Sequence, residues 1–262
     1  MDEPAARTPP HATPELASER PVHWLAAALL TFTFYVLAGL AALPLAIPPG
    51  YASPLYPAAG VALASVLLFG RRMLPALALA AVCVNLSLAA DPAHPSPTSL
   101  LLALAIGCGA ALQACAGALL VRRFTPQPLT LGEPREVIAF LLASAASCLV
   151  SSGVGNAALW FTQTVPTAKL PLSMATWWIG DLLGVLIATP VLFTLLARPR
   201  EAWAPRRMSV GLTLTLVTAL LALGVRQVVA WSHERLRTGF DRDATSATLA
   251  LAAQLQQPIH AL

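Results

Sequence analysis

The sequence predicts an all-α fold: a polytopic bundle of about seven transmembrane helices, followed by an amphipathic extracytoplasmic helix at the C-terminal end. Hydrophobic residues occupy 57% of the 262 positions and charged residues only 11%, far below the roughly 25% charged residues of soluble domains. The mean hydropathy is +0.70, and uncharged runs alternate with short segments rich in proline, glycine and arginine. These observations identify an integral membrane protein with the lipid bilayer as its main partner.

Residues 1–21 are polar, with four acids and two arginines, and they predict a disordered N-terminal segment. This segment lacks the basic start and the small-residue cleavage site of a signal peptide, so the first apolar run should stay in the membrane. That run, 22–47, contains no Asp, Glu, Lys or Arg. At about 1.5 Å per residue it is long enough to cross a hydrocarbon core of about 30 Å.

Six further apolar runs follow, at 55–70, 73–90, 98–121, 136–161, 172–196 and 209–231. Proline, glycine or arginine marks the breaks between them. The run 55–70 is short and opens with Tyr56-Pro57, and proline suits the first turn of a helix. A tilted or partly re-entrant segment is therefore the alternative to a straight span there.

The orientation follows from the basic residues between the runs, which fall in every second loop. These are Arg71, Arg72, Arg122, Arg123, Arg135, Arg198, Arg200, Arg206 and Arg207. In the other loops, 48–54, 91–97 and 162–171, Lys169 is the only lysine or arginine. By the positive-inside rule, we expect the arginine-bearing loops and the N-terminus to face the cytoplasm. Seven spans then place the C-terminus of the chain outside the membrane.

Beyond 231 the chain turns polar, yet apolar residues keep the three-four spacing of an amphipathic helix over 232–262. They are Phe240, Ala244, Ala247, Leu251, Leu255 and Leu262. Because this stripe has no later part of the chain to pack on, it either pairs with another copy or begins a longer protein. We favour the longer protein, with this helix as its homodimer contact.

The composition predicts no metal, cofactor or nucleic-acid site. The cysteines lie within apolar runs without a Cys-x-x-Cys pair, and the five histidines are scattered over tails, loops and helix ends. The basic residues lie in short loops and do not form one stripe, so we read them as topology determinants. We expect no enzyme either, because no catalytic triad or carboxylate pair appears at one depth.

Three charged residues lie within the apolar runs: Glu136, Asp181 and Arg226. Glu136 follows Pro134 at a helix start, where a carboxylate is favourable. Asp181 lies about nine residues, or roughly 14 Å, from the outer end of its helix. A charge near mid-membrane costs roughly 2.5 to 3.5 kcal/mol, so Asp181 needs a partner. One interpretation is an ion pair with Arg226, about five residues below the same surface.

The other interpretation is a pocket that opens to the outside. Neutral polar and aromatic residues fall at one depth in the outer half: Tyr56, Asn85, Asn156, Trp160, Trp177 and Trp178. Trp177 and Trp178 precede Asp181 by four and three residues, and therefore lie on its side of the helix. We name Asp181, Trp177, Trp178, Asn85, Asn156 and Tyr56 as candidates for ligand binding or switching. For Trp160, an interfacial aromatic belt is the simpler interpretation.

The same helix carries signals for close packing and bending. Gly180 and Gly184 form a small-xxx-small pair that permits close helix contact. Pro190 predicts a kink in the inner third of the helix. A kinked helix with a buried acid is a candidate moving part.

Three stretches together resemble a known family. They are Tyr56-Pro57-Ala58-Ala59-Gly60 with the turn at Arg71-Arg72, the Val84-Asn85-Leu86 helix end, and Trp177-Trp178-Ile179-Gly180-Asp181 through Thr189-Pro190. In this order they resemble the bacterial membrane-associated sensor domain of the first MASE type. The resemblance covers about 24–231, and the segment 232–262 resembles the start of an extracytoplasmic CHASE-type sensory domain.

The resemblance implies three parts: a cytoplasmic tail at 1–21, an integral membrane sensor domain at 22–231, and a truncated sensory domain that begins at 232–262. It implies a non-enzymatic input module in the bacterial inner membrane, ahead of a histidine kinase or a cyclic-di-GMP enzyme. We expect the pocket around Asp181 to bind a small molecule or a partner helix. The alternative is a secondary transporter or ion-coupled carrier in which Asp181 loads a proton or cation.

Overall fold

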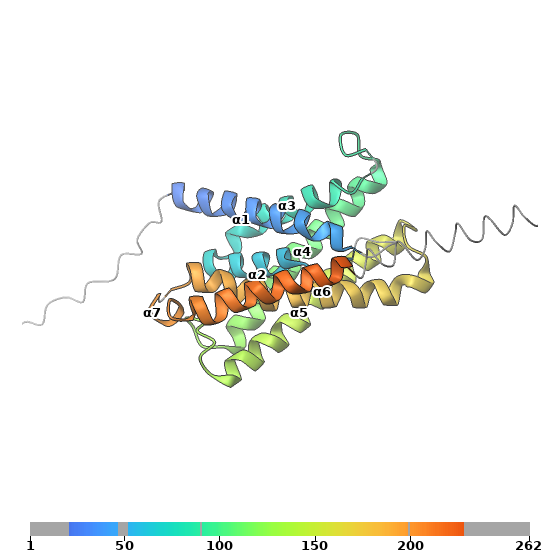
Figure 1. The fold of residues 1–262 in the computed structure, drawn as a ribbon. Coiled ribbons are helices and arrows are strands. Elements are labelled where there is room, and N and C mark those ends of the chain that lie inside the picture. Colours follow the sequence, from blue (N-terminus) through green and yellow to red (C-terminus); the bar gives the residue numbers. More distant parts are fainter. Residues whose placement is uncertain (1–20, 47–51, 90, 199, 228–262) are drawn as a thin grey trace, which may run out of the picture.

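The structure, a computed structural model, describes residues 21–46, 52–89, 91–198 and 200–227. The part of the chain that it describes contains helices and no strands. The helices are α1 Pro21–Ala42, α2 Pro57–Phe69, α3 Leu74–Leu86, α4 Pro97–Phe124, α5 Pro134–Phe161, α6 Leu170–Leu196 and α7 Arg200–Trp203. A last helical segment, Met208–Gln227, packs along α6 (Figure 1). The predicted all-α helical bundle is confirmed.

Proline starts most of these helices. A proline occupies the first turn of α2, α3, α4, α5 and α6, where the missing N–H breaks no helical bond. The Ser96 hydroxyl caps α4 by accepting a hydrogen bond from the Ser99 N–H at 3.1 Å. Gly70 ends α2 with a φ of 85°, a conformation that glycine adopts readily. The helix boundaries therefore follow from local sequence.

Within the described residues, five segments are long and apolar enough to cross a membrane: Trp24–Leu45, Pro97–Phe124, Pro134–Phe161, Thr167–Leu196 and Met208–Gln227. The remaining two expected runs form α2 and α3, each of 13 residues. At about 1.5 Å per residue each is about 20 Å long, short of a core of about 30 Å. The seven apolar runs thus become five long segments and two short helices joined by the turn Arg71–Met73.

Helix α2 is short because its first residues lie beside the middle of α6. The N–H of Tyr56 donates to the carbonyl of Gly180 at 3.1 Å, and Ala52 and Leu55 are buried. Non-helical backbone within a membrane protein's interior requires such protein partners, because lipid offers no hydrogen bonds. The run 55–70 is therefore not one straight helix of spanning length, because a non-helical segment leads into the 13-residue α2, which ends at the arginine-bearing turn Arg71–Met73.

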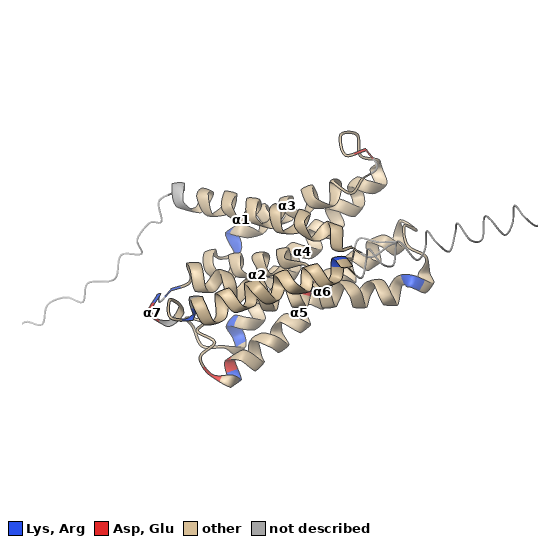
Figure 2. Ribbon diagram, in the orientation of Figure 1, with Lys and Arg blue, Asp and Glu red and all other residues tan. Residues whose placement is uncertain are grey.

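The arginine-bearing loops meet at one end of the bundle, where α7 lies (Figure 2). The Arg122 guanidinium donates to the carbonyls of Val66 and Leu67, at 3.0 and 3.1 Å. Arg206 donates to the carbonyl of Thr130, and the indole of buried Trp203 donates to Leu129 at 3.2 Å. These contacts join α4 to the end of α2, and they join α7 and Arg206 to the connection between α4 and α5.

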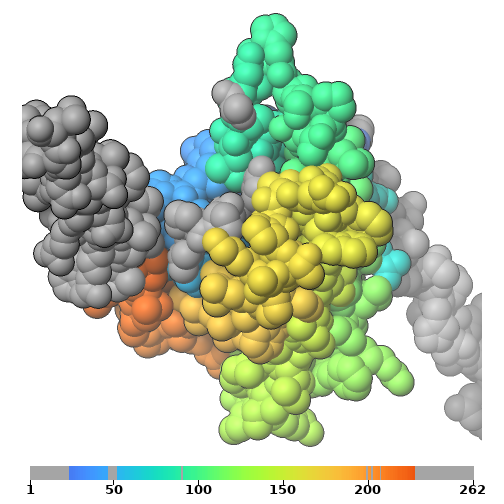
Figure 3. Space-filling view, turned by 90° about the vertical axis from the view of Figure 1, so that its right-hand side faces the viewer, coloured from blue at the N-terminus to red at the C-terminus, as the bar shows by residue number. Residues whose placement is uncertain are grey.

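Glu136 lies in the first turn of α5, and it stabilises the loop before that helix. Its carboxylate accepts from the Gly132 N–H at 2.9 Å and from the Thr130 hydroxyl at 3.2 Å. Figure 3 looks onto the opposite end of the molecule, where the α5–α6 connection, in yellow, covers much of the centre. The α3–α4 connection, in green, projects from the rim of that face (Figure 3).

Candidate functional site

Asp181 lies near the middle of α6 and is only 2% exposed. The Ser151 hydroxyl, from α5, and the Trp177 indole are the two hydrogen-bond donors that interact with its carboxylate. Trp177 belongs to the preceding turn of α6, so its side chain lies on the same side of the helix as Asp181. The acid therefore receives two donors, one from its own helix and one from a neighbour.

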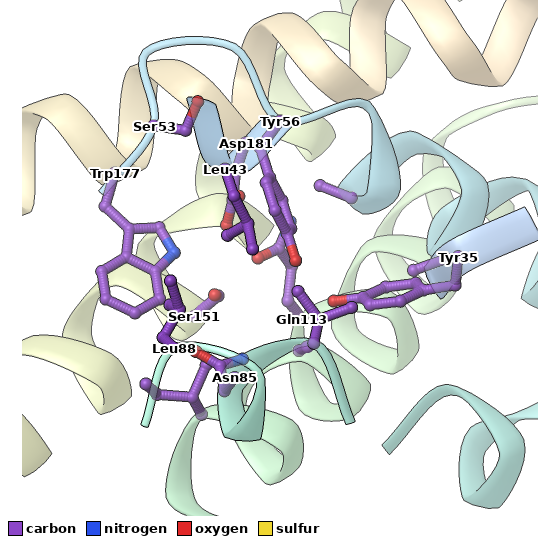
Figure 4. Close-up of a pocket in the computed structure, with 15 residues that line it drawn as sticks. Tyr35, Leu43, Ser53, Tyr56, Asn85, Leu88, Gln113, Ser151, Trp177 and Asp181 are labelled. Atoms are coloured by element: carbon purple, nitrogen blue, oxygen red, sulfur yellow. The ribbon is translucent and has the colours of Figure 1, made fainter. Parts of the chain in front are cut away.

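A small polar cavity lies beside Asp181 (Figure 4). Its lining includes residues from α1 to α6 and from the segment before α2. The polar members are Tyr35, Ser53, Tyr56, Asn85, Gln113, Ser151, Trp177 and Asp181. The cavity volume is about 30 Å³. That is room for about two water molecules, since one needs about 10–15 Å³ by this measure.

Two tyrosines extend the polar cluster from the acid to α1. The rings of Tyr35 and Tyr56 meet edge to face, with 6.4 Å between centroids, and their hydroxyls interact. Tyr56 lies beside Asp181 at the centre of the site, with Tyr35 beyond it (Figure 4). The side chain of Tyr35 is 2% exposed, so this phenol pair is buried. It connects α1 to the start of α2.

A second polar contact joins α4 and α5. The Gln113 amide donates to the Cys148 sulfur at 3.4 Å, and both side chains are buried. Gln113 also lines the cavity, on the side of Tyr35 (Figure 4). Thus every helix from α1 to α6 supplies a side chain to this site or to its wall.

The predicted glycine pair fits a backbone against α6. A methyl group at Gly180 would overlap the Ser53 carbonyl oxygen, and one at Gly184 would overlap the Tyr56 carbonyl oxygen. One turn into α2, a methyl group at Gly60 would meet Ala188 and the backbone of Gly184. Because glycine has no Cβ, the backbone of residues 53–57 comes close to α6 on either side of Asp181.

The structure brings together four of the six ligand or switch candidates. Asp181, Trp177, Asn85 and Tyr56 line one cavity. Asn85 bonds its own helix, since its amide donates to the Ala81 carbonyl at 2.8 Å.

The other two candidates face elsewhere. The Trp178 indole donates to the Ala145 carbonyl of α5 at 2.8 Å. The Asn156 amide donates to Ser152 within its own helix at 2.8 Å, and its carbonyl oxygen is buried with no partner in the described residues. Neither side chain lines the cavity.

One interpretation of Asp181 was an ion pair with Arg226, and the described residues show no contact between the two side chains. Ion pairs in the described ranges include His94 with Asp91 and Arg135 with Glu133. The Arg226 side chain is exposed. The last helix packs against Leu183 and Ile187. Each residue turns an α-helix by about 100°, so Leu183 and Ile187 lie roughly 200° and 240° around α6 from Asp181. The last helix therefore packs on the side of α6 that faces away from Asp181.

Sequence reasoning missed four polar lining residues: Tyr35, Ser53, Gln113 and Ser151. Three of them are uncharged polar residues within apolar helices, a signal weaker than a charge but readable. Ser53 lies in the segment before α2 and carries no such signal. Among the described residues, no group of three or more His, Cys, Asp or Glu side chains is placed to hold a metal ion.

Comparison with known proteins gives one finding. The family model described as MASE1 matches residues 25–234, which include α2 to α7 and all of α1 except its first four residues. No curated protein and no solved structure matches the chain.

Proposed function

The chain belongs to the MASE1 family of membrane-integral sensory domains, and we propose that it is the input module of a bacterial signal-transduction protein. Domains of this family are sensory and not catalytic. In our proposal the output is a histidine kinase or a cyclic-di-GMP enzyme. The module spans the bacterial inner membrane, with its arginine-bearing end in the cytoplasm.

The buried cluster around Asp181 is the observation that supports a sensing role. It joins α1, the start of α2, α4, α5 and α6 through polar side chains around one cavity. A change in the charge or occupancy of this cavity alters contacts of several helices at once. A stimulus shifts the helix arrangement only if it binds two arrangements with different affinity, and such a joint offers that difference.

The size of the cavity restricts what it holds in this arrangement. At about 30 Å³ it takes water molecules or a small ion, whereas pockets for drug-sized ligands measure about 300–1,000 Å³. A larger ligand therefore requires a second arrangement in which α6 and the segment before α2 separate. The small-molecule proposal thus includes an opening of the bundle at Tyr56 and Gly180, whose backbones are hydrogen-bonded.

The test is Asp181→Asn in the full-length signalling protein, with output measured in cells at matched membrane levels. We expect the output to become insensitive to the stimulus, because the amide offers one acceptor oxygen where the carboxyl group has two, and it does not ionise. Asp91→Asn is the matched control, since Asp91 is an exposed acid in the α3–α4 connection. A stimulus response of Asp181→Asn equal to that of the wild type would refute the proposed role.

An ion-coupled carrier is the second candidate, because a buried acid beside a water-sized cavity also suits proton or cation loading. Proteoliposomes that contain a pH-sensitive dye distinguish a sensor from a carrier, because the dye reports proton flux into the vesicle. A sensor leaves the internal pH unchanged under an imposed gradient. A proton flux that requires Asp181 would replace the sensor proposal with the carrier.

A further inference from the structure

A groove lies at the arginine-rich end of the bundle, far larger than the cavity at Asp181. The end of α2, residues 127–129 and the end of α6 form its walls, and its volume is about 410 Å³. Apolar residues outnumber polar ones along the wall, and among them are Leu67, Phe69, Leu129, Phe193 and Leu196. Gln127 and Arg198 add polar groups.

The groove lies where apolar helix gives way to basic loop. Leu196 ends α6, one of the segments long enough to span, and Arg198 follows two residues later. Phe69 ends α2, and Arg71 and Arg72 follow it. Phe69 is 42% exposed and Leu196 is 53% exposed. Such a transition from apolar to basic residues marks the boundary between hydrocarbon and lipid headgroups.

Positive charge dominates around the groove. Arg198 lines it with an exposed side chain, and no acid does. Arg122 lies beside the wall, where one guanidinium nitrogen, Nη2, bonds the carbonyls of Val66 and Leu67. The guanidinium has two further nitrogens with N–H donors.

The acids of the nearby α5 start are engaged elsewhere. Glu133 pairs with Arg135 at 2.6 Å, and Glu136 accepts from the Gly132 N–H. These contacts neutralise neither Arg122 nor Arg198. The groove therefore combines an apolar wall with a local excess of guanidinium groups.

We propose that this groove binds an anionic phospholipid, with its phosphate near Arg198 and Arg122 and an acyl chain along the wall at Phe69 and Leu196. The apolar wall needs a hydrocarbon chain, and the guanidinium groups need an anion, so one amphipathic anion satisfies both. A zwitterionic lipid places a cation among the arginines and is less favourable. Free glycerol phosphate matches the charge but leaves the wall in contact with water.

Native mass spectrometry of the full chain in detergent, with equal amounts of phosphatidylglycerol and phosphatidylcholine, tests this site. We expect preferential retention of phosphatidylglycerol. Arg198→Gln should weaken it about fivefold, or about 1 kcal/mol, and leave phosphatidylcholine unchanged. Arg200→Gln is the matched control, because Arg200 is exposed two residues along the chain and does not line the groove.

Two further arms distinguish the source of the anion and test the apolar wall. Phe69→Gln should also weaken phosphatidylglycerol retention several-fold, and excess glycerol 3-phosphate should not displace the lipid. Equal retention of both lipids would overturn the proposal. An equal loss of phosphatidylglycerol retention in Arg198→Gln and Arg200→Gln would also overturn it, because that result indicates diffuse surface charge. Displacement of the lipid by glycerol 3-phosphate would overturn it too, because that result indicates a free-phosphate site.

Discussion

Asp181 is stabilised by neutral donors. Placing a charge near mid-membrane costs roughly 2.5 to 3.5 kcal/mol on insertion scales. A hydrogen bond to a charged group contributes at most about 1.5–3 kcal/mol, and two donors, Ser151 and Trp177, interact with Asp181. The two quantities are of similar size, so the acid is tolerated without Arg226 as a counter-ion.

The first prediction compares two serines on the buried side of α5. Ser151→Ala removes a donor to Asp181, and we expect the free energy of unfolding to fall by about 1.5–3 kcal/mol. Ser144→Ala is the control, since the Ser144 hydroxyl is fully buried with no partner in the described residues. It should leave stability unchanged or slightly raised. Unfolding in mixed micelles, followed by tryptophan fluorescence, measures both, and equal losses would contradict this account of Asp181.

At the scale of elements, the contact between α6 and the start of α2 decides the shape of the site. It depends on close backbone approach at Gly180 and Gly184 and on few polar bonds. One is the hydrogen bond from the Thr189 hydroxyl to the Gly60 carbonyl at 3.0 Å. Such bonds between membrane helices average only about 0.6 kcal/mol, so packing contributes more here.

The second prediction follows from this packing. Gly184→Ala places a methyl group against the Tyr56 carbonyl, and the overlap should lower the free energy of unfolding by about 1–3 kcal/mol. Gly153→Ala, in α5, is the control, because no heavy atom lies within 4 Å of its added methyl group. It should be neutral or stabilising by up to about 1 kcal/mol. The same unfolding measurement applies. An unchanged free energy of unfolding in Gly184→Ala would show that the backbone at Tyr56 is not tightly packed against α6.

At the scale of the whole molecule, the arginine-bearing loops form one end of the bundle. The alternation of basic residues along the chain predicts this clustering, because consecutive spans return the chain to the same side. The clustering does not by itself orient the molecule in the membrane. The segment 232–262, predicted to be an extracytoplasmic CHASE-type helix and homodimer contact, and the predicted disordered residues 1–20 lie outside the described residues.

The third prediction concerns orientation. In a chain whose four native cysteines are replaced by serine, Ala93→Cys should react with a membrane-impermeant maleimide in intact spheroplasts. Gln127→Cys should react only after permeabilisation, because the arginine-rich end is expected in the cytoplasm. Both positions are exposed, so access to the reagent depends on the side of the membrane. The reverse labelling pattern would invert the proposed topology.

The sequence by itself determined the features that depend on local composition. The length of the apolar runs predicted the helices, and proline and glycine predicted where they end. The spacing of the arginines predicted that their loops share one end of the bundle. The Trp-Trp-x-Gly-Asp stretch predicted the family. It also singled out Asp181, Trp177, Asn85 and Tyr56, which line one cavity. These properties are read residue by residue and do not require knowledge of which helices touch.

The tertiary structure alone decided which face of each helix points inward. A membrane helix is apolar on all sides, so hydrophobic periodicity does not report its rotation about its own axis. For this reason Trp178, Asn156 and Arg226 fell outside the cavity, whereas Tyr35, Gln113 and Ser151 joined it. Packing between helices also determined the cavity's small volume and the position of the segment before α2. Both depend on glycine contacts between segments far apart in sequence.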